Sequence, residues 1–143
     1  MTVIEKAFAL QSVPAFADLR IQDLTAIARV AVHRQFAAGV TAYATESFLK
    51  ELVVVVRGEL EDTHGFPVPS VLGVASLLKD RPTSIDLCAG AEGAECLLIS
   101  KGHFFTIIHQ CPEIVRALVQ QGRGAERGGR IEPKHPTEDA LFV

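Results

Sequence analysis

The residues best suited to chemistry lie in one stretch, LGVASLLKDRPTSIDL, which runs from Leu72 to Leu87. A glycine before a short helix lets the backbone turn tightly, so the free N–H groups of the first helical turn are able to bind an anion. The threonine and serine after the proline each offer one neutral hydrogen bond to such an anion but supply no charge. The residues themselves therefore indicate an anion site at the Gly73 turn, with the hydroxyls of Thr83 and Ser84 as further candidates.

Arg81 has two interpretations, because it carries a charge but stands just before Pro82. It swings toward the bound anion and supplies a guanidinium, or it stays a solvated loop side chain. The residue before a proline is biased toward extended backbone, and this favours the solvated loop arginine.

Catalytic and metal-binding residues are not indicated elsewhere in the sequence. The five histidines are scattered, and the HExxH and GxSxG patterns are both missing. The three cysteines form no C-x-x-C pair, which predicts reduced thiols rather than a zinc site. We therefore expect a protein that is not an enzyme, with no catalytic residue, no metal and no resident cofactor.

Composition predicts one soluble domain followed by a tail. The chain has 143 residues, of which 48% are hydrophobic, and this suffices for one core. Its net charge of −3 and its lack of basic clusters predict no nucleic-acid partner. The N-terminus lacks a secretory signal pattern and no apolar run is long enough for a membrane span, which predicts a cytoplasmic protein. We expect residues 1–121 to form the domain and residues 122–143, rich in Gly, Pro and mixed charge, to be a flexible tail.

Periodicity predicts helices first and strands afterwards. Helical spacing indicates a helix from Val3 to Leu10 and a second one over residues 21–31, with Asp18 as its cap. Alternation then predicts strands over residues 32–36 and 40–45, and over residues 51–61 a third strand that turns into a fourth. Four consecutive valines at positions 53–56 cannot all face one side, so that strand should be covered on both faces.

The second half of the chain shows strands and then helices. Residues 84–89 and 95–99 are predicted strands, joined by a hairpin at residues 90–94. Ser100 is an expected N-cap for the next helix, and Pro112 begins a last helix that ends at Gln121. The wide apolar face of that helix leaves two alternatives. It forms a homodimer through residues 112–121, or it folds back over the first helix and buries Val3, Ile4 and Phe8.

The stretch from Leu72 to Leu87 resembles the phosphate-binding cassette of cyclic nucleotide-binding domains. The frame of that cassette fits at six positions: Gly73, Ala75, Leu77, Leu78, Pro82 and Ser84. Val74 stands where the family has the glutamate that binds the ribose, and Thr83 stands where it has the arginine that binds the cyclic phosphate. The resemblance implies six ligand-binding positions, with Arg81 as a possible replacement for the missing charge: Gly73, Val74, Ala75, Pro82, Thr83 and Ser84. The resemblance extends from about Ile4 to Gln120. It implies a mainly β fold, a double-stranded β-helix or jelly-roll-like β-roll with flanking helices at both ends.

The resemblance implies a regulatory protein, while the two replaced residues imply that cAMP and cGMP are not bound in the usual way. The first hypothesis is thus a non-catalytic regulatory or interaction module with a degenerate cassette. It would associate with a protein partner or with itself, and would by itself bind neither nucleic acid nor a membrane. The alternative is a functional sensor of a cyclic nucleotide or another anion, in a larger signalling or transport protein.

Overall fold

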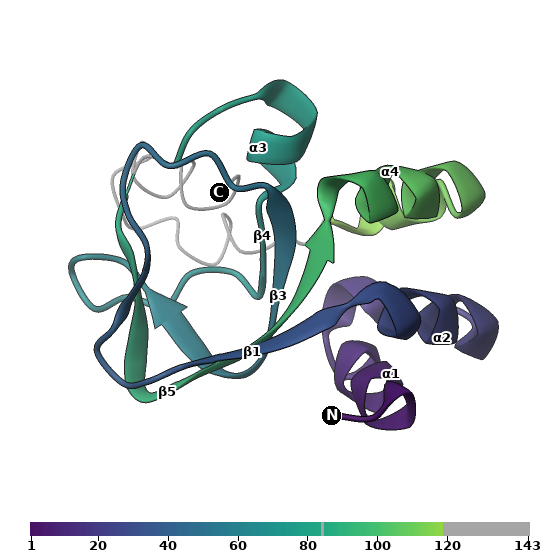
Figure 1. Cartoon of the computed structure of the whole chain (residues 1–143), viewed down its shortest axis with the longest axis horizontal. Helices are drawn as coiled ribbons and strands as arrows, with labels where there is room; N and C mark the ends of the chain where they lie inside the picture. Colours follow the sequence, from purple (N-terminus) through teal and green to yellow (C-terminus); the bar gives the residue numbers. More distant parts are fainter. Residues whose placement is uncertain (84, 119–143) are drawn as a thin grey trace.

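The computed structural model describes residues 1–83 and 85–118, so Ser84 and the tail expected at residues 122–143 lie outside the described part. One antiparallel sheet contains β1 (Val32–Phe36), β2 (Thr41–Tyr43), β3 (Glu51–Glu61), β4 (Val71–Leu72) and β5 (Leu87–Ser100). The long strand β5 lies in the centre and pairs with β1, β2 and β3. The strand order is β1-β5-β3-β4, and β4 does not pair with β1 among the described strands, so the sheet curls into an open roll (Figure 1).

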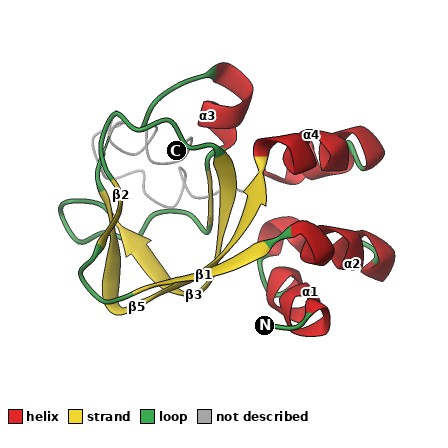
Figure 2. Ribbon diagram, in the orientation of Figure 1, coloured by secondary structure: helices red, strands yellow, loops and turns green. Residues whose placement is uncertain are grey.

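Helices cover one face of this sheet, and a further short helix lies in the connection between β4 and β5. They are α1 (Val3–Gln11), the 3-10 helix η1 (Pro14–Phe16), α2 (Ile21–Val30), α3 (Val74–Lys79) and α4 (Lys101–Gln110). Figure 2 shows α1, α2 and α4 gathered on one side, with α3 apart from α1 and α2. Residues 113–118 are also helical. The element order therefore confirms the predicted succession of helices, strands and helices.

The helix starts were predicted correctly in one case and wrongly in another. Ser100 caps α4 as expected, since its side chain accepts a hydrogen bond from the backbone N–H of His103. Asp18 does not cap α2, because the turn of η1 continues past it and the helix begins only after Arg20. Arg20 makes no side-chain cap and instead pairs with Asp23 in the first turn, at 3.2 Å.

The valine run of β3 is covered on both faces, as predicted. Leu52 and Val54 point toward the helices, whereas Val53 and Val55 point into the roll. The helix-side cluster is centred on Leu10, Phe16, Leu24, Ile27, Leu52, Val54, Leu97, Ile99, Phe104 and Ile114. The roll-interior cluster is centred on Phe36, Leu49, Val53, Val55, Leu60, Leu72, Leu87, Cys96 and Leu98. The sheet thus separates two hydrophobic cores, one beneath the helices and one inside the roll.

Two strand predictions were wrong in the same way. The run over residues 51–61 is one strand with two register shifts, and the hairpin predicted at residues 90–94 is the middle of the continuous strand β5. The glycines there serve close approach between backbones: a Cβ at Gly58 would clash with the carbonyl of Gly93, and one at Gly93 would lie 2.7 Å from the carbonyl oxygen of Phe36. The presence of glycines alone does not distinguish such a close approach between strands from a turn.

The alternative in which the last helix buries the first helix was also wrong. Ile4 and Phe8 are 68% and 64% exposed, and Val3 is 39% exposed. Ile114 and Leu118 are buried in the helix-side cluster instead. The face expected to be free for a dimer is therefore used by the core of its own chain up to Leu118, the last described residue.

Candidate functional site

The cassette, residues 73–84, begins at a glycine that the fold requires. Gly73 has φ +103°, a left-handed conformation that disfavours other residues, and a Cβ there would lie 2.7 Å from the carbonyl oxygen of Glu51. The carbonyl of Gly73 accepts the first helical hydrogen bond from Leu77 N–H at 2.9 Å. The six-residue helix α3 then ends at Lys79, and its C-cap residue Asp80 is itself left-handed with φ +51°. The predicted turn and short helix are both present.

Thr83 is a structural residue at the position where the family has a phosphate-binding arginine. Its side chain is buried, with the residue 1% exposed. The hydroxyl donates to the carbonyl of Ala44 at 2.8 Å and accepts from the backbone N–H of Ser47 at 3.1 Å. Two backbone hydrogen bonds, from Thr83 N–H to Ser47 and from Glu46 N–H to Thr83, close the same contact. The proton that the hydroxyl could offer to an anion is already used within the protein.

Ser76 is a second residue of the cassette whose polar group is engaged internally, and sequence reasoning did not single it out. It is 4% exposed and its hydroxyl donates to the carbonyl of Arg81 at 2.6 Å. This bond holds the chain that follows α3 against the helix. A serine in place of an aliphatic residue on the buried face of a short helix was the only signal available.

The other candidate positions do not converge on one cavity. Val74 is half-buried and packs against the helix-side cluster, whereas we expected its methyl groups to line a ligand pocket. Ala75 is buried, while Arg81 and Pro82 are exposed. Ser84 lies outside the described residues. The structure thus brings Thr83 into a tight internal contact and leaves the charged candidate, Arg81, at the surface.

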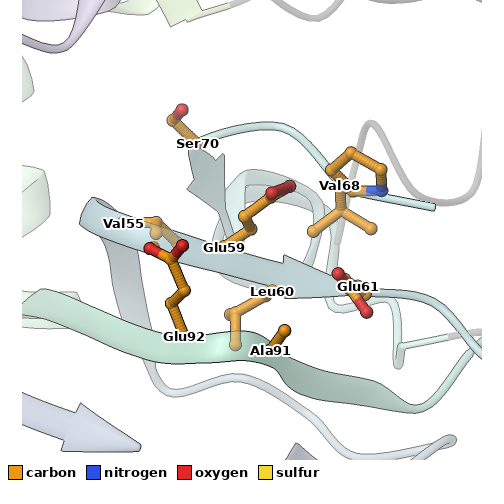
Figure 3. A pocket seen from close by; sticks show the side chains of 10 residues that line it. Val55, Glu59, Leu60, Glu61, Val68, Ser70, Ala91 and Glu92 are labelled. Carbon is orange, nitrogen blue, oxygen red and sulfur yellow. The ribbon is translucent and has the colours of Figure 1, made fainter. Parts of the chain in front are cut away.

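The roll interior opens through a cavity of about 500 Å³ between β3, β5 and the loop over residues 62–70. Val55, Leu60 and Val68 form its apolar part, and Figure 3 shows these side chains with the carboxylates around them. The charged residues among its lining are Glu59, Glu61 and Glu92. Acidic walls without a lining cation disfavour a phosphate group at this opening.

A cluster of polar side chains lies on the helix-covered face of the sheet, and the sequence analysis did not predict it. His33 and Gln35 of β1 point to the same side as Glu95 of β5, in register across the two strands. Gln35 Nε2 donates to Glu95 Oε2 at 3.0 Å, and Arg57 Nη1 lies 3.6 Å from Glu95 Oε1. The Gln35 hydrogen bond is the main cause that lowers the pKa of Glu95, with His33 and Arg57 adding to it against the effect of burial. Alternation along β1 could have placed His33 and Gln35 on one face of the strand, but not beside Glu95.

Burial disfavours the ionised forms of two cysteines and one tyrosine, so these side chains are not activated for chemistry. Burial raises the pKa of Cys96 and of Tyr43 to about 12, and that of Cys111 to about 11. A thiol with a raised pKa is a poor nucleophile at neutral pH. The described cysteines are free thiols, as predicted.

Neither a metal-binding cluster nor a membrane-spanning helix is found among the described residues. No cluster of three or more His, Cys, Asp or Glu side chains there is arranged to hold a metal ion. Within the same residues, no helix has the length and apolar character needed to cross a membrane.

Sequence comparisons find no family model and no curated protein that matches the chain. Solved structures do match it. The Catabolite Activator Protein of Thermus thermophilus is similar with a TM-score of 0.66 and 17% identity, over 82% of this chain and 60% of that chain. A protein from Geobacter metallireducens GS-15, provisionally titled a cyclic nucleotide-binding protein, is similar with a TM-score of 0.64 and 19% identity, over 88% of this chain and 98% of that one.

The chain therefore spans only 60% of the length of the Thermus protein, but nearly all of the Geobacter one. At these identities the likeness is one of fold. The antiparallel sheet with flanking helices matches the β-roll fold of these structures. The protein has the cyclic nucleotide-binding domain fold.

Proposed function

We propose that the protein is a cytoplasmic, non-catalytic regulatory or interaction module of this fold that does not bind cAMP or cGMP through its cassette. The observation that carries the proposal is the state of Thr83. It is 1% exposed and its hydroxyl is held by Ala44 and Ser47, so it does not replace the guanidinium that the family uses on a phosphate.

Energetics supports the same conclusion. Removing one partner of a buried charge pair costs about 2–5 kcal/mol, which is roughly thirtyfold to several thousandfold in affinity. The cassette lacks both charged partners, since Val74 and Thr83 replace the glutamate and the arginine. The carboxylates of Glu59, Glu61 and Glu92 at the opening of the roll add repulsion toward an anion.

Isothermal titration calorimetry of the full chain with cAMP and cGMP tests this proposal. We expect no saturable heat up to high micromolar nucleotide. Micromolar binding of either nucleotide by the parent, weakened in the Thr83→Val variant, would overturn the proposal. Thr83 would then be a ligand-binding residue. Thr63→Val, at an exposed loop position, is the matched control.

The alternative is an anion sensor that uses Arg81 at the edge of the cassette. Arg81 is exposed and its backbone is held to α3 by Ser76, so its position is fixed although its side chain faces outward. A panel of phosphates would bind the parent and not Arg81→Ala if this alternative is right. Equal behaviour of the two proteins excludes it.

Association with a protein partner or with a second copy remains part of the proposal, and the role of residues 112–121 in it is reduced. Ile114 and Leu118, which were expected to face a second copy, are 1% and 6% exposed in the chain's own core. Light scattering of the parent at high micromolar concentration tests self-association directly. A monomer there would remove the homodimer.

A further inference from the structure

A cavity of about 560 Å³ lies between α1 and the outer face of the sheet, away from the cassette. The residues that define its chemistry are Phe8 and Ala9 of α1, His33 of β1, Val56 and Arg57 of β3 and Glu95 of β5. Cavities that bind small molecules are mostly apolar, have about 300–1,000 Å³ and contain a few convergent polar groups. This cavity lies within that range of volume and contains such polar groups, although its lining is more polar than is usual for such sites. Its lining residues are separate from those at the opening of the roll interior.

The polar groups of this cavity are incompletely satisfied, in contrast to those of the cassette. Glu95 Oε2 accepts from Gln35, but Oε1 is buried and has no hydrogen-bond partner in the described part of the chain. His33 Nε2 is also buried and lies 3.0 Å from Glu95 Oε2, in an orientation that makes no hydrogen bond. A buried acceptor that stays unpaired has lost its hydrogen bonds to water without replacement, which destabilises the fold. A ligand that donates to Oε1 restores a hydrogen bond there.

Arg57 is the nearest cation to the free oxygen, and it is a weak partner. Its Nη1 lies 3.6 Å from Glu95 Oε1, which is too far for a hydrogen bond. Its side chain is 76% exposed, so water competes with the carboxylate for the guanidinium. A ligand head with well-placed N–H groups can replace it at low cost.

The apolar wall is provided mainly by the first helix. Phe8 is 64% exposed and presents its ring at the cavity, where Val56 and Ala9 are half-buried. Glu5 also lines the cavity, but its carboxylate is already bound to Thr2 N–H at 2.7 Å in the helix cap. The site therefore combines an aromatic face with one carboxylate oxygen that seeks a donor.

We propose that this cavity binds a small molecule with an apolar, planar body and an N–H-donating head, such as an amidine, with the head hydrogen-bonded to Glu95 and the body against Phe8. A planar amidine donates two parallel N–H groups to a carboxylate, the geometry that makes such pairs strong. An anionic head is repelled by the same carboxylate. The ligand would also hold α1 against the sheet, since the cavity lies between them.

Benzamidine and benzoate are the probes, because they share a ring and differ in the head. In NMR titrations of the full chain we expect benzamidine to give saturable shifts of the backbone amides of Phe8, Val56 and Glu95, and benzoate to give none there. Absence of saturable shifts, equal shifts with both probes, or shifts confined to other regions would overturn the proposal.

Two variants test the roles of the charged groups in opposite directions. Glu95→Gln replaces a charge-assisted pair with a neutral one and should weaken benzamidine by at least about tenfold. Arg57→Ala removes the competing cation and should tighten benzamidine by up to about fivefold. Glu92→Gln, on the same strand but outside this cavity, should leave the affinity unchanged.

The Arg57 variant keeps the test decisive even where Glu95→Gln lowers stability, because Arg57 is an exposed side chain whose removal disturbs the fold little. Weaker benzamidine binding by Arg57→Ala would mean that the guanidinium holds the ligand, and an unchanged affinity in Glu95→Gln would mean that the carboxylate does not. Either result overturns the proposal. Neither depends on whether the cassette binds a nucleotide.

Discussion

The cassette and the cavity beneath α1 use their polar side chains in opposite ways. In the cassette, Thr83 and Ser76 are buried and their hydroxyls are bound to the protein's own backbone. Beneath α1, Glu95 and His33 are half-buried, and each has one buried polar atom without a hydrogen-bond partner among the described residues. The two buried hydroxyls described in the cassette are thus both used within the protein, whereas beneath α1 the buried oxygen Oε1 of Glu95 accepts no hydrogen bond from the described residues.

This difference indicates that two residues of the cassette, Gly73 and Thr83, have structural roles. Gly73 allows the chain to pass close to Glu51, and the contact of Thr83 with Ala44 and Ser47 fixes the loop between β2 and β3. A glycine and a threonine at motif positions can therefore be required by the fold itself. Binding capacity is better sought where buried polar atoms remain unsatisfied.

The largest expected effect concerns the glycine that opens the cassette. Gly73→Ala should lower the free energy of unfolding by about 2–6 kcal/mol, from left-handed strain of about 1–3 kcal/mol and a backbone clash of about 1–3 kcal/mol. Gly65→Ala is the matched control: its φ is +83°, but nothing lies within 4 Å of the added Cβ, so about 1–2 kcal/mol is expected. Urea unfolding measures both. Equal losses would show that conformation alone, rather than close approach to β3, requires Gly73.

A smaller effect is expected at the threonine that replaces the family's arginine. Thr83→Val keeps the shape and removes both hydroxyl hydrogen bonds, so the free energy of unfolding should fall by about 1–2 kcal/mol. Ser47 N–H keeps a weaker bond to the carbonyl of Ala44 at 3.3 Å, which limits the loss. Thr63→Val at an exposed loop position should change stability by less than about 0.5 kcal/mol. A neutral Thr83→Val would remove the structural role of this hydroxyl.

The sequence predicted the frame of the fold well because its signals are local. The Ser100 cap, the turn at Gly73 and the two-sided burial of the valines at 53–56 each depend on neighbouring residues. The failures required contacts between distant segments. Gly58 and Gly93 look like turn residues, and only the close approach of Gly58 to β5 and of Gly93 to Phe36 of β1 shows why each must lack a side chain.

The candidate site was predicted in position but not in chemistry. Thr83 stood out by its place in the motif, and its two hydrogen bonds depend on residues 39 and 36 positions earlier, Ala44 and Ser47. The cluster around Glu95 was missed because His33 and Gln35 lie 60 or more positions from it and meet it only through strand pairing. A single sequence does not reveal such register.

The smallest expected effect separates the two regions by pH. The folded pKa of Glu95 is lowered from the ordinary 4.5, mainly by the hydrogen bond from Gln35, so the unfolded chain binds the proton at higher pH than the folded chain does. This stabilisation is fully present above the ordinary pKa and is lost as the pH falls through the folded value. The parent should therefore lose stability as the pH falls from about 6 to about 3.5. Glu95→Gln should lose less stability over the same range, and the difference should be less than about 1 kcal/mol.

Urea unfolding at the two pH values measures this difference, with Glu92→Gln as the exposed control on the same strand. Thr83→Val should lose as much stability on acidification as the parent, because the groups that it disturbs, the hydroxyl and the backbone of Ala44 and Ser47, do not titrate. A Glu95→Gln protein with the parent's full acid sensitivity would mean that Gln35 and Arg57 do not favour the ionised carboxylate. A Thr83→Val protein with altered sensitivity would mean that the cassette and the cluster beneath α1 are coupled through the sheet, and the contrast between the two regions would then fail.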